Sequence, residues 1–172
     1  SEYCSLIMLS GTGMMLMASA SDMLILYLSL ELMSLSIYVL TGFKRDDERA
    51  NEAALKYFLL GTLGAIIFLF SLTLVYGITG TTNIYKIADY IKFSGLVSNP
   101  LLLLAVSLSL TTFAFKIAAV PFHQWAPDVY EGAPTTITAF MSVAPKAAVF
   151  AAFGRVFYDS FLSMHVNWSE FM

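Results

Sequence analysis

The sequence carries little charge. Only 12% of its 172 residues are Asp, Glu, Lys or Arg, whereas about a quarter of the residues of a soluble globular domain are charged. Hydrophobic residues make up 58% of the chain, and the mean hydropathy is +0.75. This composition excludes a soluble enzyme and indicates a protein that is exposed to lipid.

Basic residues and cysteines are also few. Nine Lys and Arg stand against twelve Asp and Glu, a net charge of −3, which leaves no basic excess to neutralise nucleic-acid phosphates. The single cysteine, Cys4, has no partner within the chain, and Cys and His residues do not recur at the spacing of a metal site. We therefore expect no nucleic-acid partner, no intrachain disulfide and no metal.

The N-terminus has no feature of a signal peptide. Ser1 stands in place of an initiator Met, and Glu2 precedes an apolar run without any basic residue. A signal peptide carries positive charge at that point. We expect the chain to be part of a longer polypeptide.

Long stretches of the chain are nearly free of charge. A membrane-spanning helix needs about 20 mostly apolar residues, and five stretches qualify: 3–20, 22–43, 52–78, 100–120 and 134–158. We predict an all-α fold, a polytopic transmembrane helical bundle that forms one domain over residues 1–172. Ser21 or Asp22 would cap the second span, and Gly, Asn and Pro residues predict breaks in a longer connection over about 77–100.

The only dense run of charge lies at residues 44–49. It contains three of the nine basic residues, and such a run does not lie in lipid. The positive-inside rule places it in the cytoplasm or the equivalent compartment.

Three prolines interrupt the region after the fourth span. Pro121 lacks an amide donor and leaves the carbonyl of Ile117 without its helical partner, and Pro127 and Pro134 follow. We predict a broken helix that continues as the segment 122–131. Transporters build ion sites at such breaks.

Glu31 lies near the middle of the second span. An ionised group there costs about 2.5–3.5 kcal/mol. On a helix, Tyr27, Ser34 and Tyr38 share its face and form one polar stripe. Because intramembrane carboxyl groups mark ion paths, we interpret Glu31 as a functional residue.

Lys116 and Lys146 are the corresponding intramembrane cations. Lys116 shares a helix face with Ser109 and Thr112, and Lys146 shares one with Thr138 and Ser142. We expect the two hydroxyl-lined faces to converge on a shared chain of water. A buried lysine whose opposite charge comes and goes can bind and release a proton, so these residues predict a proton relay.

Lys56 and His123 are further candidates. Lys56 stands close to the start of the third span, where it can pair with Glu52 one turn earlier or with Glu31 on the preceding span. His123 suits either proton transfer or a role in holding the irregular segment. Asp128 is expected to be a capping or solvated residue of that segment.

Three stretches of this sequence resemble a known family. They are Glu31-Leu32-Met33-Ser34-Leu35, residues 51–58 and residues 115–134, the last containing Pro-Phe-His-Gln-Trp and Gly-Ala-Pro. Together they resemble the antiporter-like subunit N family of respiratory complex I, which includes mitochondrial subunit 2. The resemblance extends over residues 22–155.

The resemblance implies two inverted repeats of five helices, each with one broken helix, of which this chain would hold the first. By the same likeness, Glu31 is the key glutamate, Lys56 its partner lysine, Lys116 the central lysine and Lys146 the connecting lysine. These residues would translocate protons, driven by redox chemistry elsewhere. NADH, flavin, iron–sulfur clusters and quinone would lie in partner subunits of NADH:quinone oxidoreductase, and this chain would bind no cofactor.

The expected partners are other membrane-arm subunits, the second repeat and the lipid bilayer. The expected location is an energy-transducing membrane: the bacterial inner membrane, or alternatively the mitochondrial inner membrane or the thylakoid. Two other functions stay open. One is a cation/proton antiporter subunit of the multisubunit sodium–proton type, and the other is a structural membrane scaffold without proton transfer.

Overall fold

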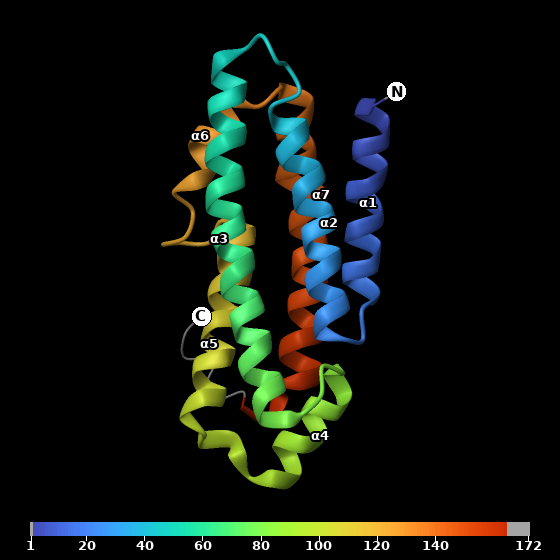
Figure 1. Ribbon diagram of the computed structural model, residues 1–172, viewed down its shortest axis with the longest axis vertical. Coiled ribbons are helices and arrows are strands. Elements are labelled where there is room, and N and C mark those ends of the chain that lie inside the picture. Colours follow the sequence, from blue (N-terminus) through green and yellow to red (C-terminus); the bar gives the residue numbers. More distant parts are fainter. Residues whose placement is uncertain (1, 165–172) are drawn as a thin grey trace.

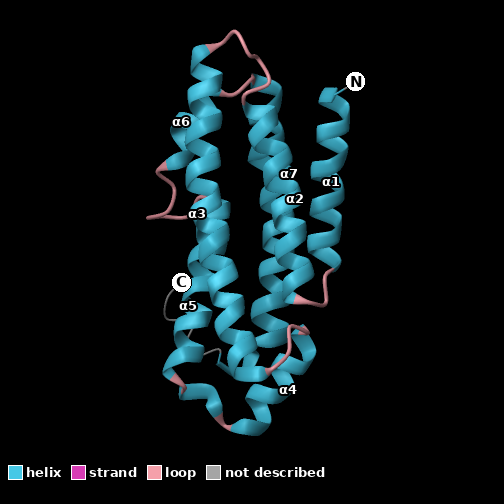
Figure 2. Ribbon diagram, in the orientation of Figure 1, coloured by secondary structure: helices cyan, strands magenta, loops and turns pink. Residues whose placement is uncertain are grey.

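The computed structural model describes residues 2–164, and this part of the chain is almost entirely helical (Figure 2). Within it, a single bridge between Asp22 and Asn83 is the only β pairing. The α-helices are α1 (Glu2–Ser19), α2 (Met23–Thr41), α3 (Glu48–Thr79), α4 (Ile84–Ser94), α5 (Pro100–Ile117), α6 (Trp125–Gly132) and α7 (Thr135–Gly154). Short helical turns follow at Leu96–Ser98, Arg155–Ser160 and Leu162–Met164. The predicted all-α bundle is confirmed.

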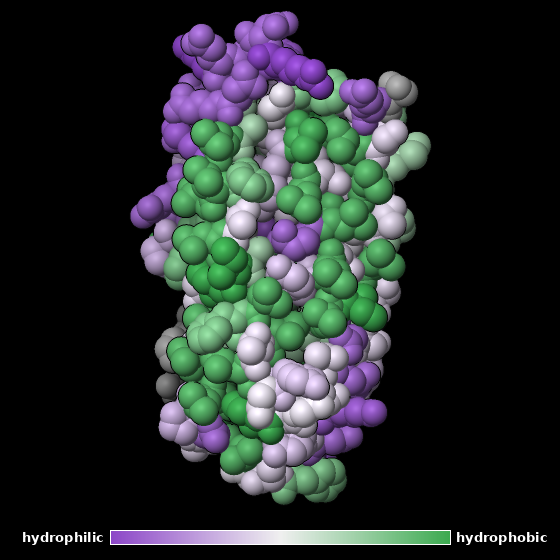
Figure 3. Space-filling view, viewed as in Figure 1, coloured by the Kyte–Doolittle hydropathy of each residue, from purple (hydrophilic) through white to green (hydrophobic). Residues whose placement is uncertain are grey.

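Within residues 2–164, four segments are long and apolar enough to cross a membrane: Met23–Thr41, Glu48–Thr79, Pro100–Ile117 and Thr135–Ser160. The first predicted span, 3–20, forms α1, which packs along α2 (Figure 1). Glu2 and several small polar residues lower the mean hydropathy of α1, so α1 is not among the helices that are apolar enough to cross a membrane. Apolar side chains cover most of the middle of the visible face around a small polar patch, and polar ones gather at the end where the loop 42–47 lies and at the lower right edge (Figure 3).

Asp and Asn residues start the helices α2 to α5. Asp22, Asp47, Asn83 and Asn99 each accept hydrogen bonds from the first free amides of the helix that follows. Such caps satisfy donors that have no partner inside the helix. The predicted cap at the start of the second span is therefore Asp22.

The connection after α3 contains a helix that we did not expect. Within the longer connection predicted over about 77–100, the chain forms α4, which buries Ile84, Ile87 and Ile91 on one face. The spacing of these isoleucines is that of an amphipathic helix. The α4 helix lies at the end of the bundle opposite the loop 42–47 (Figure 1), and Ile84 O accepts a bond of 3.1 Å from Ser160 Oγ.

The predicted break between the fourth span and the segment 122–131 is confirmed, but it begins earlier than residue 120. The α5 helix ends at Ile117 because Ala118 adopts the left-handed conformation, with φ 59°. The amides of Ala118 and Ala119 then bond to Phe115 O and Ala114 O at 3.1 and 2.8 Å. This arrangement satisfies the last carbonyls of α5 and turns the chain out of the helix.

Candidate functional site

Lys116 lies in the last turn of α5, just before the break, and only 7% of it is exposed. Its Nζ donates to Ser34 Oγ at 2.8 Å and to Tyr38 Oη at 3.4 Å. Both acceptors belong to the polar stripe predicted on α2. The structure therefore joins the α2 stripe to the α5 lysine.

Glu31 belongs to the same cluster as Lys116. It stands one turn before Ser34 on α2 and is half-buried, and its charge interacts with that of Lys116. The Oε1 atom of Glu31 is buried and has no hydrogen-bond partner among the described residues. An unpaired buried oxygen of this kind costs free energy unless water or another group reaches it.

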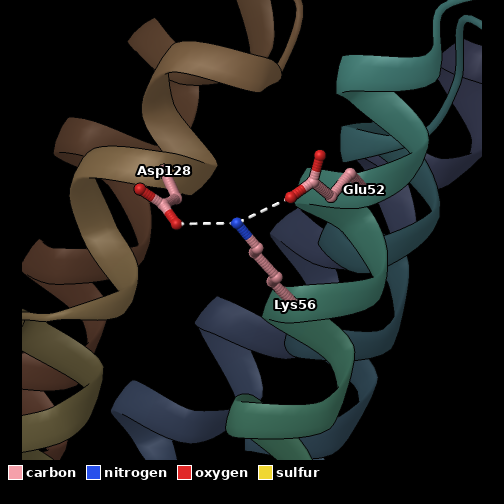
Figure 4. Close-up of polar contacts among 3 residues, drawn as sticks. All are labelled: Glu52, Lys56 and Asp128. Carbon is pink, nitrogen blue, oxygen red and sulfur yellow. Dashed lines mark hydrogen bonds and ion pairs between the residues drawn. The ribbon is translucent and has the colours of Figure 1, made fainter.

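Lys56 is not paired with Glu31, and the prediction of that pair is wrong for this structure. Its Nζ lies 2.8 Å from Glu52 Oε1 and 2.8 Å from Asp128 Oδ2 (Figure 4). The side toward α2 is occupied by Tyr57, whose ring packs edge-on against Tyr38 at 4.7 Å. Consecutive residues point about 100° apart on a helix, so Lys56 is directed toward α6 instead.

The role expected of Asp128 was incomplete: its side chain is exposed, as expected of a solvated residue, but it also has a charged partner. It forms this ion pair across 72 positions of sequence. Figure 4 shows the Lys56 ammonium between Glu52 of its own helix and Asp128 of α6. The expected pairing of Lys56 with Glu52 is confirmed, and Asp128 is a site residue that we missed.

Lys146 lies on α7 and is half-buried. Its Nζ is 5.5 Å from the centre of the Tyr130 ring on α6, which is within the range of a cation–π interaction. The Tyr130 hydroxyl is buried and has no hydrogen-bond partner in residues 2–164.

The hydroxyl groups predicted beside the two lysines bind protein atoms. Ser109 Oγ lies 2.6 Å from Ser71 Oγ, and Thr112 Oγ1 donates to Gly64 O on α3 at 3.2 Å. Thr138 donates to Tyr130 O at 3.0 Å, and Ser142 donates to Ala139 O at 2.8 Å. Ser109 and Thr112 thus join α5 to α3, and Thr138 joins α7 to α6, whereas Ser142 bonds within α7. The shared chain of water beside the two lysines stays a prediction.

His123 lies in the turn between α5 and α6 and is exposed, unlike the buried Lys116. Its backbone carbonyl accepts a bond of 2.9 Å from the amide of Ala126. The structure thus places His123 outside the Lys116 cluster.

Four aromatic side chains connect the surroundings of Lys116 and Lys146, a role that we did not predict for them. We call Tyr38, Tyr57, Trp125 and Tyr130 the aromatic column; successive ring centres are 4.7, 4.8 and 6.0 Å apart. Lys116 Nζ lies 5.8 Å from the Tyr38 ring at one end. Gly61 permits this packing, since a side chain there would collide with the Tyr38 hydroxyl. The helical periodicity of the polar stripe identifies Tyr38, whereas nothing local indicates the other three.

Metal-binding groups are not part of this arrangement. In residues 2–164, no three His, Cys, Asp or Glu side chains are grouped so that they could hold a metal ion. The chemistry available at the Lys116 cluster is that of ammonium, carboxyl, hydroxyl and phenol groups, which exchange protons.

Comparison with known proteins identifies the family. Residues 20–172 match the family described as NADH:quinone oxidoreductase/Mrp antiporter, TM. The chain is 52% identical over 171 residues to NADH-quinone oxidoreductase subunit N of Trichlorobacter lovleyi, covering 99% of this chain and 35% of that protein. The chain thus spans about a third of the length of this relative.

Solved structures agree with the sequence comparison. A chain of respiratory complex I from Thermus thermophilus with bound aureothin superposes with a TM-score of 0.78 at 41% identity, over 90% of this chain and 34% of that one. A chain of the Mrp complex from Dietzia sp. DQ12-45-1b gives 0.80 at 25% identity, over 91% and 29%. The chain is a membrane protein and belongs to the NADH:quinone oxidoreductase/Mrp antiporter transmembrane family.

Proposed function

We propose that the chain is part of a membrane-arm subunit of NADH:quinone oxidoreductase and that it moves protons by way of Lys116, Glu31, Lys146 and Lys56. The observation that carries this proposal is the burial of Lys116 beside a helix break, where it binds Ser34, one turn of α2 from Glu31 and its buried, unpaired Oε1 atom. Charged groups inside a membrane bundle are costly and mark ion pathways.

The Lys116 cluster can hold a proton and release it. As an ammonium, Lys116 donates to Ser34 and Tyr38 and is attracted by ionised Glu31. Protonation of Glu31 would remove that attraction and favour release of the Lys116 proton, because a buried charge without a partner is unfavourable. A change in the charge of one group would therefore favour a change in the charge of the other.

We propose that Lys146 accepts charge from the Lys116 cluster and that Lys56 responds to the movement of that charge. Lys146 lies at the far end of the aromatic column from Lys116. Lys56 lies on α3, where Glu52 of the same helix and Asp128 of α6 stabilise its charge. His123, which is exposed, would contribute only by binding water near the break.

The redox reaction would belong to other subunits. The relatives named as subunit N support an assignment to that complex. NADH, flavin, iron–sulfur and quinone chemistry would then lie in partner chains, with this chain contributing proton transfer and no redox step. The remaining length of the relatives leaves room for the second repeat, and their bacterial sources favour the inner membrane as the location.

A second candidate is a cation/proton antiporter subunit. The family description names the Mrp antiporter, and a chain of the Mrp complex superposes with a TM-score of 0.80. The same lysines and glutamate would serve either function. Dependence of transport on sodium would separate the antiporter from the proton pump.

The test is Lys116→Ala in the complete, assembled complex in sealed vesicles. General acid–base groups contribute factors of about 10²–10⁴, so we expect proton uptake to fall at least about tenfold while subunit content is retained. Lys86→Ala, at an exposed position of α4, is the matched control and should leave uptake unchanged. Normal proton stoichiometry in Lys116→Ala would favour the scaffold function instead.

A further inference from the structure

The short helix α6 contacts the surroundings of all three candidate lysines. The contacts are Asp128 Oδ2 to Lys56 Nζ at 2.8 Å, Trp125 Nε1 to Phe115 O, one residue before Lys116, at 3.0 Å, and the Tyr130 ring to Lys146 Nζ at 5.5 Å. Any displacement of α6 therefore changes the environment of more than one lysine.

Both ends of α6 are packed closely against α3. At its start, Trp125 stacks on Tyr57 with a ring separation of 4.8 Å and an angle of 7°. At its end, a Cβ on Gly132 would lie 2.6 Å from Ala53 Cβ and 2.8 Å from Arg49 O. Only glycine allows the two helices to approach so closely at that point.

Between these two contacts, Asp128 supplies the only ion pair recorded between α6 and α3 in residues 2–164. Lys56 has two carboxylate neighbours at the same distance of 2.8 Å, but they differ in what they connect (Figure 4). Glu52 lies one turn before Lys56 on α3, so that pair stays within one helix. Asp128 lies on α6, so its pair with Lys56 joins two helices.

We propose that Asp128 is a positioning residue: its ion pair with Lys56 holds α6 against α3 and thereby keeps Trp125 at the end of α5 and Tyr130 beside Lys146. This inference rests on the proposed proton-transfer function and assigns Asp128 a part in it. Loss of the charge on Lys56 would remove the attraction to Asp128 and weaken the contact between α6 and α3, which the packing at both ends of α6 otherwise maintains. The charge on Lys56 thus influences Lys116 and Lys146 through the position of one helix, and the influence is reciprocal.

The experiment compares Asp128→Asn with Glu52→Gln in the complete subunit within its assembled complex. Both variants neutralise one carboxylate at the same distance from Lys56, and only the first affects the pair that joins the helices. Amide hydrogen exchange is measured on peptides that cover α6. We expect about two- to fivefold faster exchange in Asp128→Asn, the range typical of an ion pair with partly exposed partners.

Glu52→Gln should leave the exchange of α6 as it is in the unmodified subunit. Asp128→Glu, which keeps the charge, should show the slow exchange of α6 found in the unmodified subunit and retain its proton uptake. Equal exchange in Asp128→Asn and Glu52→Gln, or no rescue by Asp128→Glu, would overturn the inference.

The two proposals fail in different ways. Hydrogen exchange reports the hold on α6 whether or not protons are pumped, whereas Lys116→Ala tests pumping directly. If Lys116→Ala leaves pumping intact while Asp128→Asn speeds the exchange of α6, the proposal of proton transfer is contradicted. The proposal that Asp128 positions α6 is then still supported.

Discussion

Lys116 illustrates how one buried cation depends on its immediate neighbours. Ser34, Tyr38 and Glu31 all belong to α2, and together they supply two hydrogen-bond acceptors and one opposite charge. Removing one member of a buried, opposite-charge pair is usually more harmful than removing both, because the remaining charge loses its compensation.

A double-mutant cycle tests whether Glu31 acts together with Lys116. We expect Glu31→Gln and Lys116→Met to be non-additive in the rate of proton uptake, with a coupling of about 0.5–3 kcal/mol, as found for residues in one charged network. Glu31→Gln combined with Lys86→Met, at the exposed position on α4, should be additive. Additive losses for the first pair would show that Glu31 and Lys116 work independently.

Glu31, Lys116 and Lys146 can be predicted because a charge inside a long apolar stretch is visible in the sequence itself. Their partners cannot be predicted in this way. Lys116 and Ser34 are 82 residues apart, and Lys56 and Asp128 are 72 residues apart. The choice of partner depends on how each helix is rotated in the bundle, which the local pattern does not specify.

The helices owe their positions to small residues and to caps. On α1, Gly13 faces the α2 backbone so closely that a Cβ would lie 2.6 Å from Met33 N and 2.8 Å from Ser29 O. Backbone atoms of a helix cannot move aside as a flexible side chain can. The contact between α1 and α2 therefore requires glycine at this position.

Gly13→Ala should move α1 away from α2. An overpacked contact of this kind lowers the free energy of unfolding by about 1–3 kcal/mol, so the unfolding temperature of the complex should fall. Gly11→Ala is the matched control, because a Cβ there meets no atom within 4 Å. It should be neutral or slightly stabilising, since alanine favours the helix. Thermal unfolding of the solubilised complex measures both, and equal unfolding temperatures would contradict the close α1–α2 contact.

The break after α5 was predictable from Pro121, but its starting residue was not. The helix ends at Ile117 because Ala118 takes a left-handed conformation, which alanine does not signal as glycine would. The α4 helix was missed for the opposite reason. Flanking Gly and Asn residues suggested a loop, although its three buried isoleucines follow the period of a helix.

The bundle as a whole exposes large apolar side chains on its outer surface and places a few polar side chains within a mostly apolar core. Large apolar residues such as Leu28, Leu35 and Val39 are exposed on α2, whose other positions include Ser34 and Tyr38 inside the bundle. Composition and uncharged stretches were sufficient to predict this architecture. The aromatic column and the contacts of α6 were beyond such prediction, because they join residues from helices that are distant in the sequence.

The most direct test of proton transfer by this chain is Lys116→Arg in the assembled complex, followed by proton uptake and quinone reduction in sealed vesicles. Arginine keeps the positive charge and the hydrogen-bond donors, but its guanidinium stays protonated in proteins. If Lys116 must release a proton, Lys116→Arg will lose uptake at least about tenfold, as Lys116→Ala does. If the charge alone matters, Lys116→Arg will pump with the unmodified stoichiometry, and the proposed role of Lys116 as a proton carrier will be contradicted.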